Sequence, residues 1–107
     1  MIMRVYRCTM VAGKDAEFLG TALATTHSWL RQQPGLVAFY AGRPPADSNS
    51  RERCMVQIWQ NIDAIKAAFG DNWRMPRNLP EEMRPLVESA SVSVEHYDIA
   101  DEFHSII

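Results

Sequence analysis

The spacing of apolar residues along the chain predicts strands and helices in alternation. Residues 3–10, MRVYRCTM, mix β-branched, aromatic and other apolar side chains with arginines, a composition that favours a strand. Apolar positions then recur three and four residues apart, which predicts a helix over residues 14–33 with one buried face. That face is expected to contain Leu19, Ala22, Leu23, Thr26 and Leu30.

Two apolar runs follow the turn at Pro34 and Gly35. GLVAFYAGR and RCMVQIWQ are separated by prolines and small polar residues, so we expect two strands joined by an exposed hairpin loop. Asn61 is placed to cap a second helix, because its side chain can accept a bond from a free backbone N–H of the first turn. The apolar face of that helix is expected to contain Ile62, Ile65 and Phe69.

The remaining segment is expected to be irregular before it ends in a strand. Three prolines interrupt residues 70–85, which predicts a loop connection with one short helical turn near residues 81–84. SASVSVEHYDI, residues 89–99, alternates apolar and polar positions with the period of two that is typical of a strand.

The order of these elements predicts an α+β fold. Strand, helix, strand, strand, helix, strand is the ferredoxin-like βαββαβ arrangement, here one domain over residues 1–107 with both helices on one face of a four-stranded antiparallel sheet. The two middle strands are apolar at consecutive positions, so the other face also requires burial. We expect a homodimer whose sheets close face to face into an α+β barrel. The tail, residues 101–107, is expected to be flexible or to pack on the partner.

Composition narrows the function classes only a little. The formal net charge is -2, which gives no electrostatic reason to bind nucleic acid or an anionic membrane. Arginines interrupt the apolar N-terminus, and no signal peptide or membrane span is recognisable, so we expect a cytoplasmic protein. The histidines are not at metal-ligand spacing, and we expect no metal site.

Two cysteines are too few for a disulfide framework. Cys8 lies near the end of the first strand and Cys54 near the start of the third, and these strands are antiparallel neighbours in a ferredoxin-like fold. The two residues are therefore candidates for cross-strand neighbours. We expect buried thiols rather than a disulfide, which would require particular geometry and an oxidising compartment.

Aromatic residues are the candidates for ligand contact. Trp59, at the end of the third strand, offers an indole face and an N–H, yet the same side chain also suits an ordinary core position. Trp29 borders the apolar stripe of the first helix, and Trp73 follows Gly70 in the irregular connection, where it can act as a lid or anchor the loop.

His27 and His96 are the candidate proton carriers, because imidazole titrates near neutral pH. Neither has an identified carboxylate partner, so a structural role is the competing interpretation for both. Tyr6, Tyr40 and Arg43 can donate hydrogen bonds to a phenol or carbonyl oxygen, although strand tyrosines are common packing residues.

Four motifs, G-K-D-A-E-F, P-G-L-V-A-F-Y, I-W-Q-N-I-D-A-I-K and V-E-H-Y-D, make nearly the whole chain resemble the antibiotic biosynthesis monooxygenase domain family of dimeric α+β barrels. The family includes cofactor-free monooxygenases of polycyclic aromatic substrates, heme-degrading enzymes and quinol-modifying proteins. Trp59 matches a position that the heme-degrading branch uses. That branch has an asparagine near Tyr6 and a heme-ligating histidine near Phe69, so the resemblance disfavours heme degradation here.

The resemblance implies a cofactor-independent monooxygenase that acts on a small aromatic or quinol-type substrate, with no cofactor of its own. His27 or His96 would then be the base that deprotonates the substrate. The alternative is a non-catalytic ligand-binding or stress-related dimer of the same fold. The side chains expected to contact a small hydrophobic or aromatic ligand are Trp59, Trp29, Tyr6, Tyr40, Phe69 and Trp73.

Overall fold

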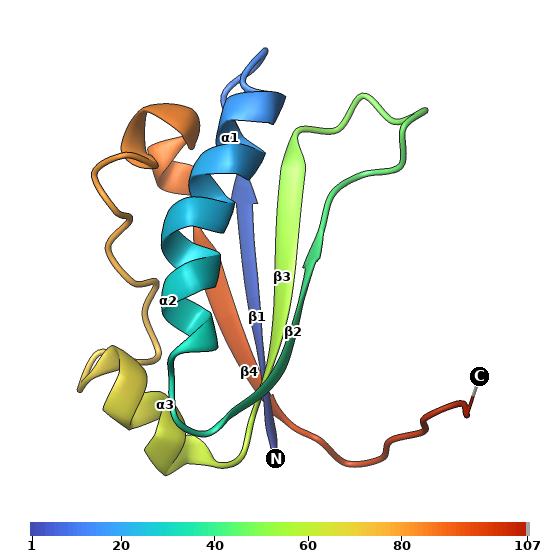
Figure 1. Ribbon diagram of the computed structural model, residues 1–107, viewed down its shortest axis with the longest axis vertical. Helices are drawn as coiled ribbons and strands as arrows, with labels where there is room; N and C mark the ends of the chain where they lie inside the picture. The colour runs from blue at the N-terminus through green and yellow to red at the C-terminus, as the bar shows by residue number, and fades with distance from the viewer. Residues whose placement is uncertain (107) are drawn as a thin grey trace.

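A computed structural model describes residues 1–106 and contains one four-stranded antiparallel sheet (Figure 1). Its strands are β1 (Ile2–Thr9), β2 (Leu36–Gly42), β3 (Glu52–Trp59) and β4 (Ser93–Asp98), in the spatial order β2-β3-β1-β4. The central strands β1 and β3 pair over their full length. This is the ferredoxin-like order, and the predicted fold class is confirmed.

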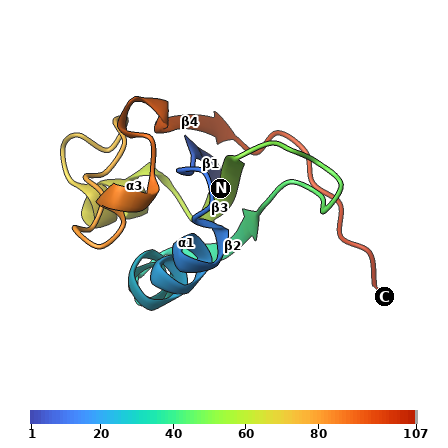
Figure 2. The same cartoon turned by 90° about the horizontal axis from the view of Figure 1, so that it is seen from above.

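All the helices lie on one side of the sheet (Figure 2). The long helix consists of α1 (Asp15–Ala22), a π-helical turn η1 (Leu23–His27) and α2 (Ser28–Arg31). The second predicted helix is α3 (Ile62–Phe69), which Asn61 caps by accepting a 2.9 Å hydrogen bond from the Ala64 N–H. No helix within residues 1–106 has the length and apolar character needed to cross a lipid bilayer.

The π-helical turn changes which residues of the long helix are buried. Leu23 is 46% exposed, although helical spacing predicts it on the buried face, and His27 is buried instead. A π turn inserts one extra residue, so five positions rather than four separate buried Ala22 from the next buried side chain. The Thr25 hydroxyl donates to the Thr21 carbonyl oxygen at 2.8 Å, a local bond that competes with regular helical bonding. Leu19 is also exposed, which corrects that prediction.

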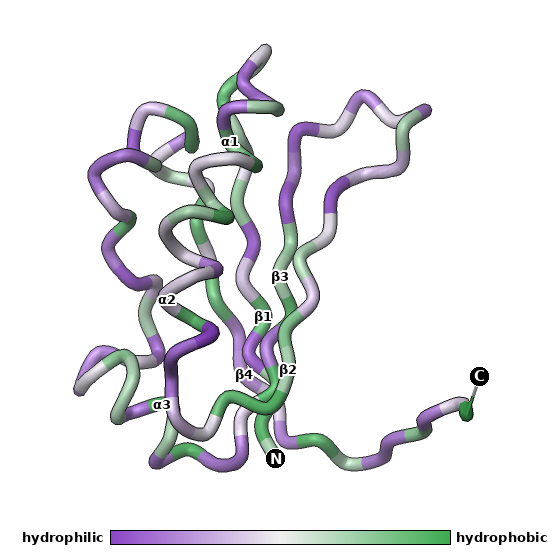
Figure 3. The backbone as a smooth tube through the Cα atoms, in the orientation of Figure 1, coloured by the Kyte–Doolittle hydropathy of each residue, from purple (hydrophilic) through white to green (hydrophobic). Residues whose placement is uncertain are grey.

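The connection from α3 to β4 follows the predicted irregular course (Figure 1). Its short helical turn is a 3₁₀ turn, η2 (Arg84–Leu86), and a second one, η3 (Ser89–Ser91), delays the start of β4 beyond the predicted residue 89. Figure 3 shows that much of this connection is hydrophilic, while the strands beside it contain both apolar and hydrophilic stretches. Leu86 and Val87 anchor its end in the core.

Cross-strand pairing assigns each strand residue to a face, because directly paired residues point the same way. The rows on the helix-covered face are Leu36–Trp59–Ile2–Asp98, Phe39–Gln57–Arg4–His96 and Ala41–Met55–Tyr6–Val94. The rows on the open face are Ala38–Ile58–Met3–Tyr97, Tyr40–Val56–Val5–Glu95 and Gly42–Cys54–Arg7–Ser93.

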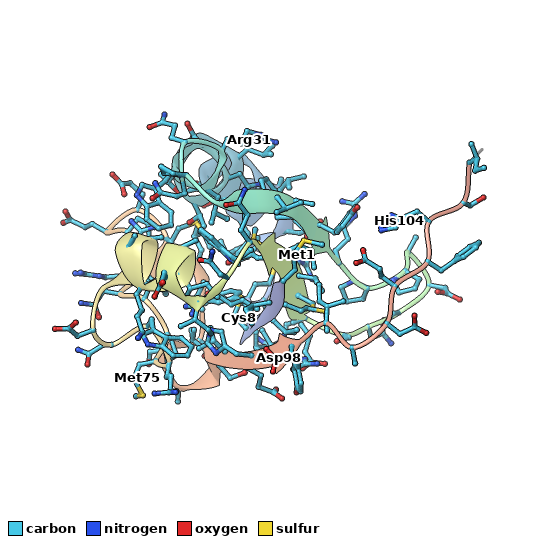
Figure 4. All side chains as sticks on the ribbon, turned by 90° about the horizontal axis from the view of Figure 1, so that it is seen from below. Met1, Cys8, Arg31, Met75, Asp98 and His104 are labelled. Carbon is cyan, nitrogen blue, oxygen red and sulfur yellow. The ribbon has the colours of Figure 1, made fainter. Side chains whose placement is uncertain are left out.

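The two cysteines fall on opposite faces by the same pairing. Cys8 pairs with Arg53, and Cys54 pairs with Arg7, so the thiols are one residue out of register. Both thiols are free; Cys8 is buried and lies inside the molecule in Figure 4, whereas Cys54 is only half-buried. The two candidates for cross-strand neighbours are therefore not directly paired, since a one-residue offset reverses the face. Burial raises the pKa of the Cys8 thiol, which keeps it protonated.

Packing under the helices forms two apolar clusters rather than one. The larger contains Trp59, Leu30 and Ile65, all with no exposed surface, together with Ile2, Met55 and Trp73. The smaller contains Cys8, Ala22, Met83, Leu86 and Val87 at the other end of the sheet. Residues of both clusters also line a cavity under the long helix.

Candidate functional site

A cavity of about 220 Å³ lies between the long helix and the covered face of the sheet. The helix contributes Phe18, Ala22, Thr26, His27, Trp29 and Leu30, and the sheet contributes Arg4, Tyr6, Ala41, Arg53, Met55 and Gln57. Further lining residues are Phe69 of α3 and Arg77, Leu79, Pro80 and Met83 of the connection before β4. The lining is mostly apolar, with a few polar groups that converge on it, which is the usual composition of a small-molecule site.

His27 is the buried imidazole of this cavity. The π-helical turn places it between Ala22 and Leu30 on the inner face, where its ring contacts Phe39 at a centroid distance of 5.4 Å. Burial, and secondarily the charge of Arg31, lowers the pKa of His27, so the imidazole is neutral at neutral pH. A neutral imidazole can accept a proton from a bound molecule.

Arg4 is the buried cation of the same cavity, with 2% of its surface exposed. Its Nη1 donates to the Trp73 carbonyl oxygen at 2.5 Å and to His96 Nε2 at 2.8 Å. Its guanidinium carbon lies 3.9 Å from the centroid of the Phe69 ring. Burial lowers the pKa of Arg4 to about 10, which still leaves the side chain charged at neutral pH.

His96, the second predicted base, lies beside the cavity rather than in its lining. Because arginine can only donate, the bond from Arg4 requires His96 Nε2 to accept, so the ring is neutral and protonated on Nδ1. Burial, together with the charges of Arg4 and Arg74, lowers the pKa of His96. The Trp73 ring packs against it edge-on at 4.8 Å between centroids. The lone pair that a base would use is thus already occupied.

Trp59 is fully buried and is not part of the cavity wall. Its indole N–H donates to Gln57 Oε1 at 3.0 Å, and Phe69 packs edge-on between it and Trp29, at 5.6 and 5.5 Å between ring centroids. Of the expected ligand contacts, Tyr6, Trp29 and Phe69 line the cavity, whereas Trp59 and Trp73 belong to the packed cluster behind it.

Tyr40 lies on the open face, paired with Val56, and is 68% exposed. The structure therefore separates it from the other expected ligand contacts. Tyr6 faces the cavity, where burial and the neighbouring Cys8 raise the pKa of its phenol. Tyr6 is consequently a hydrogen-bond donor at neutral pH.

Sequence reasoning missed Arg4, Gln57 and Arg77 as lining residues. Arg4 had a readable signal, because it is in phase with Ile2 and Tyr6 on the same strand face. Arg77 had none, since it lies in an irregular segment and reaches the site by stacking 3.9 Å above the Trp29 ring centroid. Within residues 1–106 no three histidine, cysteine or acidic side chains gather as a metal site would require.

Comparison with known proteins relates the chain to others through structure alone. No protein-family model and no curated protein sequence matches it. A variant of SnoaB, a cofactor-independent oxygenase from Streptomyces nogalater, is 21% identical over 97% of both chains with a TM-score of 0.65. The heme degrader MhuD from Mycobacterium tuberculosis, with two hemes bound, is 14% identical over 97% of this chain and 100% of its own, with a TM-score of 0.70.

A candidate antibiotic biosynthesis monooxygenase from Nitrosomonas europaea is also similar, with 14% identity over 92% of this chain and 97% of its own and a TM-score of 0.65. These identities are too low to transfer an activity, but the similarity spans nearly the whole of each chain. The chain therefore has the α+β fold of the antibiotic biosynthesis monooxygenases, as its sequence motifs predict.

Proposed function

We propose that the protein is a cofactor-independent monooxygenase that oxidises a small aromatic or quinol-type substrate in the cavity under the long helix. The observation that carries this proposal is His27, a buried and neutral imidazole in a mostly apolar cavity. SnoaB, which shares the fold, is described as a cofactor-independent oxygenase. Direct oxidation by O₂ requires an electron-rich anion, and a positioned base produces one from a phenol.

In this mechanism His27 takes the hydroxyl proton of the substrate. The resulting phenolate donates electrons to O₂, and a new carbon–oxygen bond forms at a ring carbon that carries hydrogen. Loss of water then gives the quinone, so one oxygen atom of O₂ enters the product, the other leaves as water, and the substrate supplies the electrons. Phe18, Leu30 and Met55 supply apolar contacts to the substrate ring, while Tyr6 and Gln57 offer polar contacts that orient it.

Heme is a poor fit to the same residues. At about 220 Å³ the cavity is smaller than the roughly 300–1,000 Å³ of pockets that hold drug-sized ligands. Phe69 packs between Trp29 and Trp59 under the guanidinium of Arg4, and the family resemblance places the heme-ligating histidine of the heme-degrading branch near this residue. We therefore propose a substrate of one or two rings and no iron chemistry.

The proposed assembly is a homodimer through the open face of the sheet. Val56, Ile58 and Ala38 lie on that face, and Tyr40 and Tyr97 on it are largely exposed. An apolar sheet surface of this kind favours association. The chain after Ile99 leaves the sheet on the side away from the helices (Figures 1 and 2), with Phe103 88% exposed, so we propose that this tail packs on the partner. Ile107 lies outside the described residues.

The test is oxygen consumption with a panel of small phenols and quinols. Replacement of a general base typically costs about 10²–10⁴-fold in rate, so His27→Ala should lose at least 100-fold in turnover. His104→Ala, on the exposed tail, is the matched control and should keep full activity. His96→Ala tests the second expected base and should reduce turnover far less than His27→Ala. Full turnover by His27→Ala would contradict the mechanism.

The second candidate is a non-catalytic ligand-binding dimer. The observation that favours it is Trp59, which is buried behind Phe69 and makes its only side-chain hydrogen bond within residues 1–106 to Gln57. In that case the same phenols would bind, as measured by quenching of Trp29 fluorescence, and no oxygen would be consumed.

A further inference from the structure

Arg4 is a buried charge without a counter-ion among the described residues. The ion pairs within residues 1–106 involve Arg7, Lys14, Arg51, Arg53 and His104, and none involves Arg4. A cation that is removed from water is costly unless a carboxylate or an equivalent anion neutralises it. Arg4 has only a carbonyl oxygen, an imidazole and the face of Phe69, which carry no full negative charge.

The guanidinium of Arg4 also has N–H donors for which no hydrogen bond is found among residues 1–106. Its fork has five N–H donors, and the two hydrogen bonds found among residues 1–106 both use Nη1. No fully buried side-chain nitrogen within these residues lacks a partner, so the Nε and Nη2 edge of Arg4, for which no hydrogen bond is found, keeps some accessible surface, and Arg4 lines the cavity. That edge is the part of arginine that binds a carboxylate or phenolate oxygen.

The other charged residues of the cavity lining do not neutralise Arg4. Arg53 is neutralised by Asp15, which is the one acidic residue in the lining. Arg43 and Arg77 are exposed enough for solvent to screen them. The cavity lining therefore combines the buried positive charge of Arg4 on the sheet with the neutral imidazole of His27 on the helix.

We propose that Arg4 is the anion anchor of the site and that the cavity binds its phenolic ligand as the phenolate, with the oxygen on the free edge of the guanidinium. This assignment rests on the proposed small aromatic ligand and adds which ionic form is bound and which residue selects it. An arginine so placed makes the bound hydroxyl more acidic, and the proton that leaves has His27 as its acceptor.

The experiment uses 4-nitrophenol, because its phenolate absorbs visible light and its neutral form does not. Titrated with the wild-type protein, the bound dye should ionise about one pKa unit or more below the free dye, which corresponds to at least tenfold tighter binding of the phenolate. Arg4→Gln should abolish this displacement, and Arg4→Lys should retain part of it because the charge remains. Arg7→Gln is the matched control: Arg7 lies on the same strand, faces the open side and pairs with Glu95, so the displacement should be unchanged.

Thermal unfolding of each variant establishes that it is folded, and Arg4→Lys provides the test if Arg4→Gln does not fold. Wild-type protein that binds the neutral dye as tightly as the phenolate, or that binds neither, overturns the proposal. An equal displacement in the Arg4 variants overturns it as well. Oxygen consumption is measured separately. A lowered pKa of the bound dye without oxygen consumption supports Arg4 as the anion anchor and contradicts the proposed oxygenase activity. Oxygen consumption without a change in the dye pKa supports the oxygenase activity and contradicts the anion anchor.

Discussion

The two faces of the sheet differ in composition: the face under the helices carries polar groups suited to ligand binding, and the open face carries apolar groups suited to assembly. The covered face carries a polar row in which Gln57 and Arg4 are buried and His96 is half-buried, under a helix that adds the buried His27. The open face carries Val56, Ile58 and Tyr40 without any layer above them. Buried polar groups cost stability, so those on the covered face are better explained by ligand binding than by packing. Exposed apolar groups favour association, so those on the open face are better explained by assembly.

The largest effect is expected from placing a charge on the open face. In the proposed dimer, Val56→Asp puts one carboxylate on each side of the two-fold interface, and a buried unpaired charge costs about 2–5 kcal/mol in such settings. If the proposed dimer forms through this face, the variant should sediment as a folded monomer. Ala16→Asp, an equal change at an exposed position of α1, should leave the assembly unchanged. An intact Val56→Asp dimer would show that another surface holds the subunits together.

Gly35, between α2 and β2, lies close to α3 on the covered side. Gly35 has φ of 85°, and a Cβ added to it would lie 2.5 Å from the Ala64 side chain of α3. Gly35→Ala should therefore reduce the free energy of unfolding by about 2–4 kcal/mol, from backbone strain and steric overlap together. Gly13→Ala has φ of 77° but no atom within 4 Å, so it should show the strain alone. If urea denaturation shows equal losses of unfolding free energy for Gly35→Ala and Gly13→Ala, close packing at Gly35 makes no contribution.

Trp59 and Trp29 distinguish core from site within the covered face. Trp59→Phe removes the indole N–H and leaves Gln57 Oε1 unpaired, which should cost about 1–3 kcal/mol of stability without changing turnover. Trp29→Phe alters the cavity wall and should raise KM for the phenol that the oxygen assay identifies. Steady-state kinetics and urea unfolding on both variants make the comparison. A large fall in kcat for Trp59→Phe would show that Trp59 takes part in the reaction and is not only a core residue.

The smallest effect is a dependence of stability on pH. Burial lowers the pKa of His27 and of His96 in the folded protein, so the unfolded chain binds protons more readily. Stability should thus be full above the ordinary histidine value of 6.5 and should decrease as the pH falls through it toward the folded pKa. Urea midpoints between about pH 5 and pH 8 measure this, since histidine titrates in that window. His27→Gln should flatten the curve.

Local chemistry made most of the fold predictable. Asn61 predicts the start of α3 because its side chain caps the helix, and the apolar strands around Trp59 predict a sheet that is apolar on both faces.

The candidate site was harder to predict from the sequence. Trp59 looked like a ligand contact because indoles are common in sites, yet Phe69 fills the space beside it. Leu23 is exposed against the prediction, and His27 is buried, because helical periodicity assumes 3.6 residues per turn and the π turn breaks that assumption.

By itself the sequence determined the order of strands and helices, the capping of α3 and the apolar character of both sheet faces, because these follow from local propensity and periodicity. Tertiary structure alone decided which polar groups meet. Arg4 and His96 are 92 residues apart in the chain, and only the pairing of β1 with β4 places the guanidinium nitrogen 2.8 Å from the imidazole. Spacing along the chain carries no information about such contacts, so the charge of the cavity became visible only in the folded molecule.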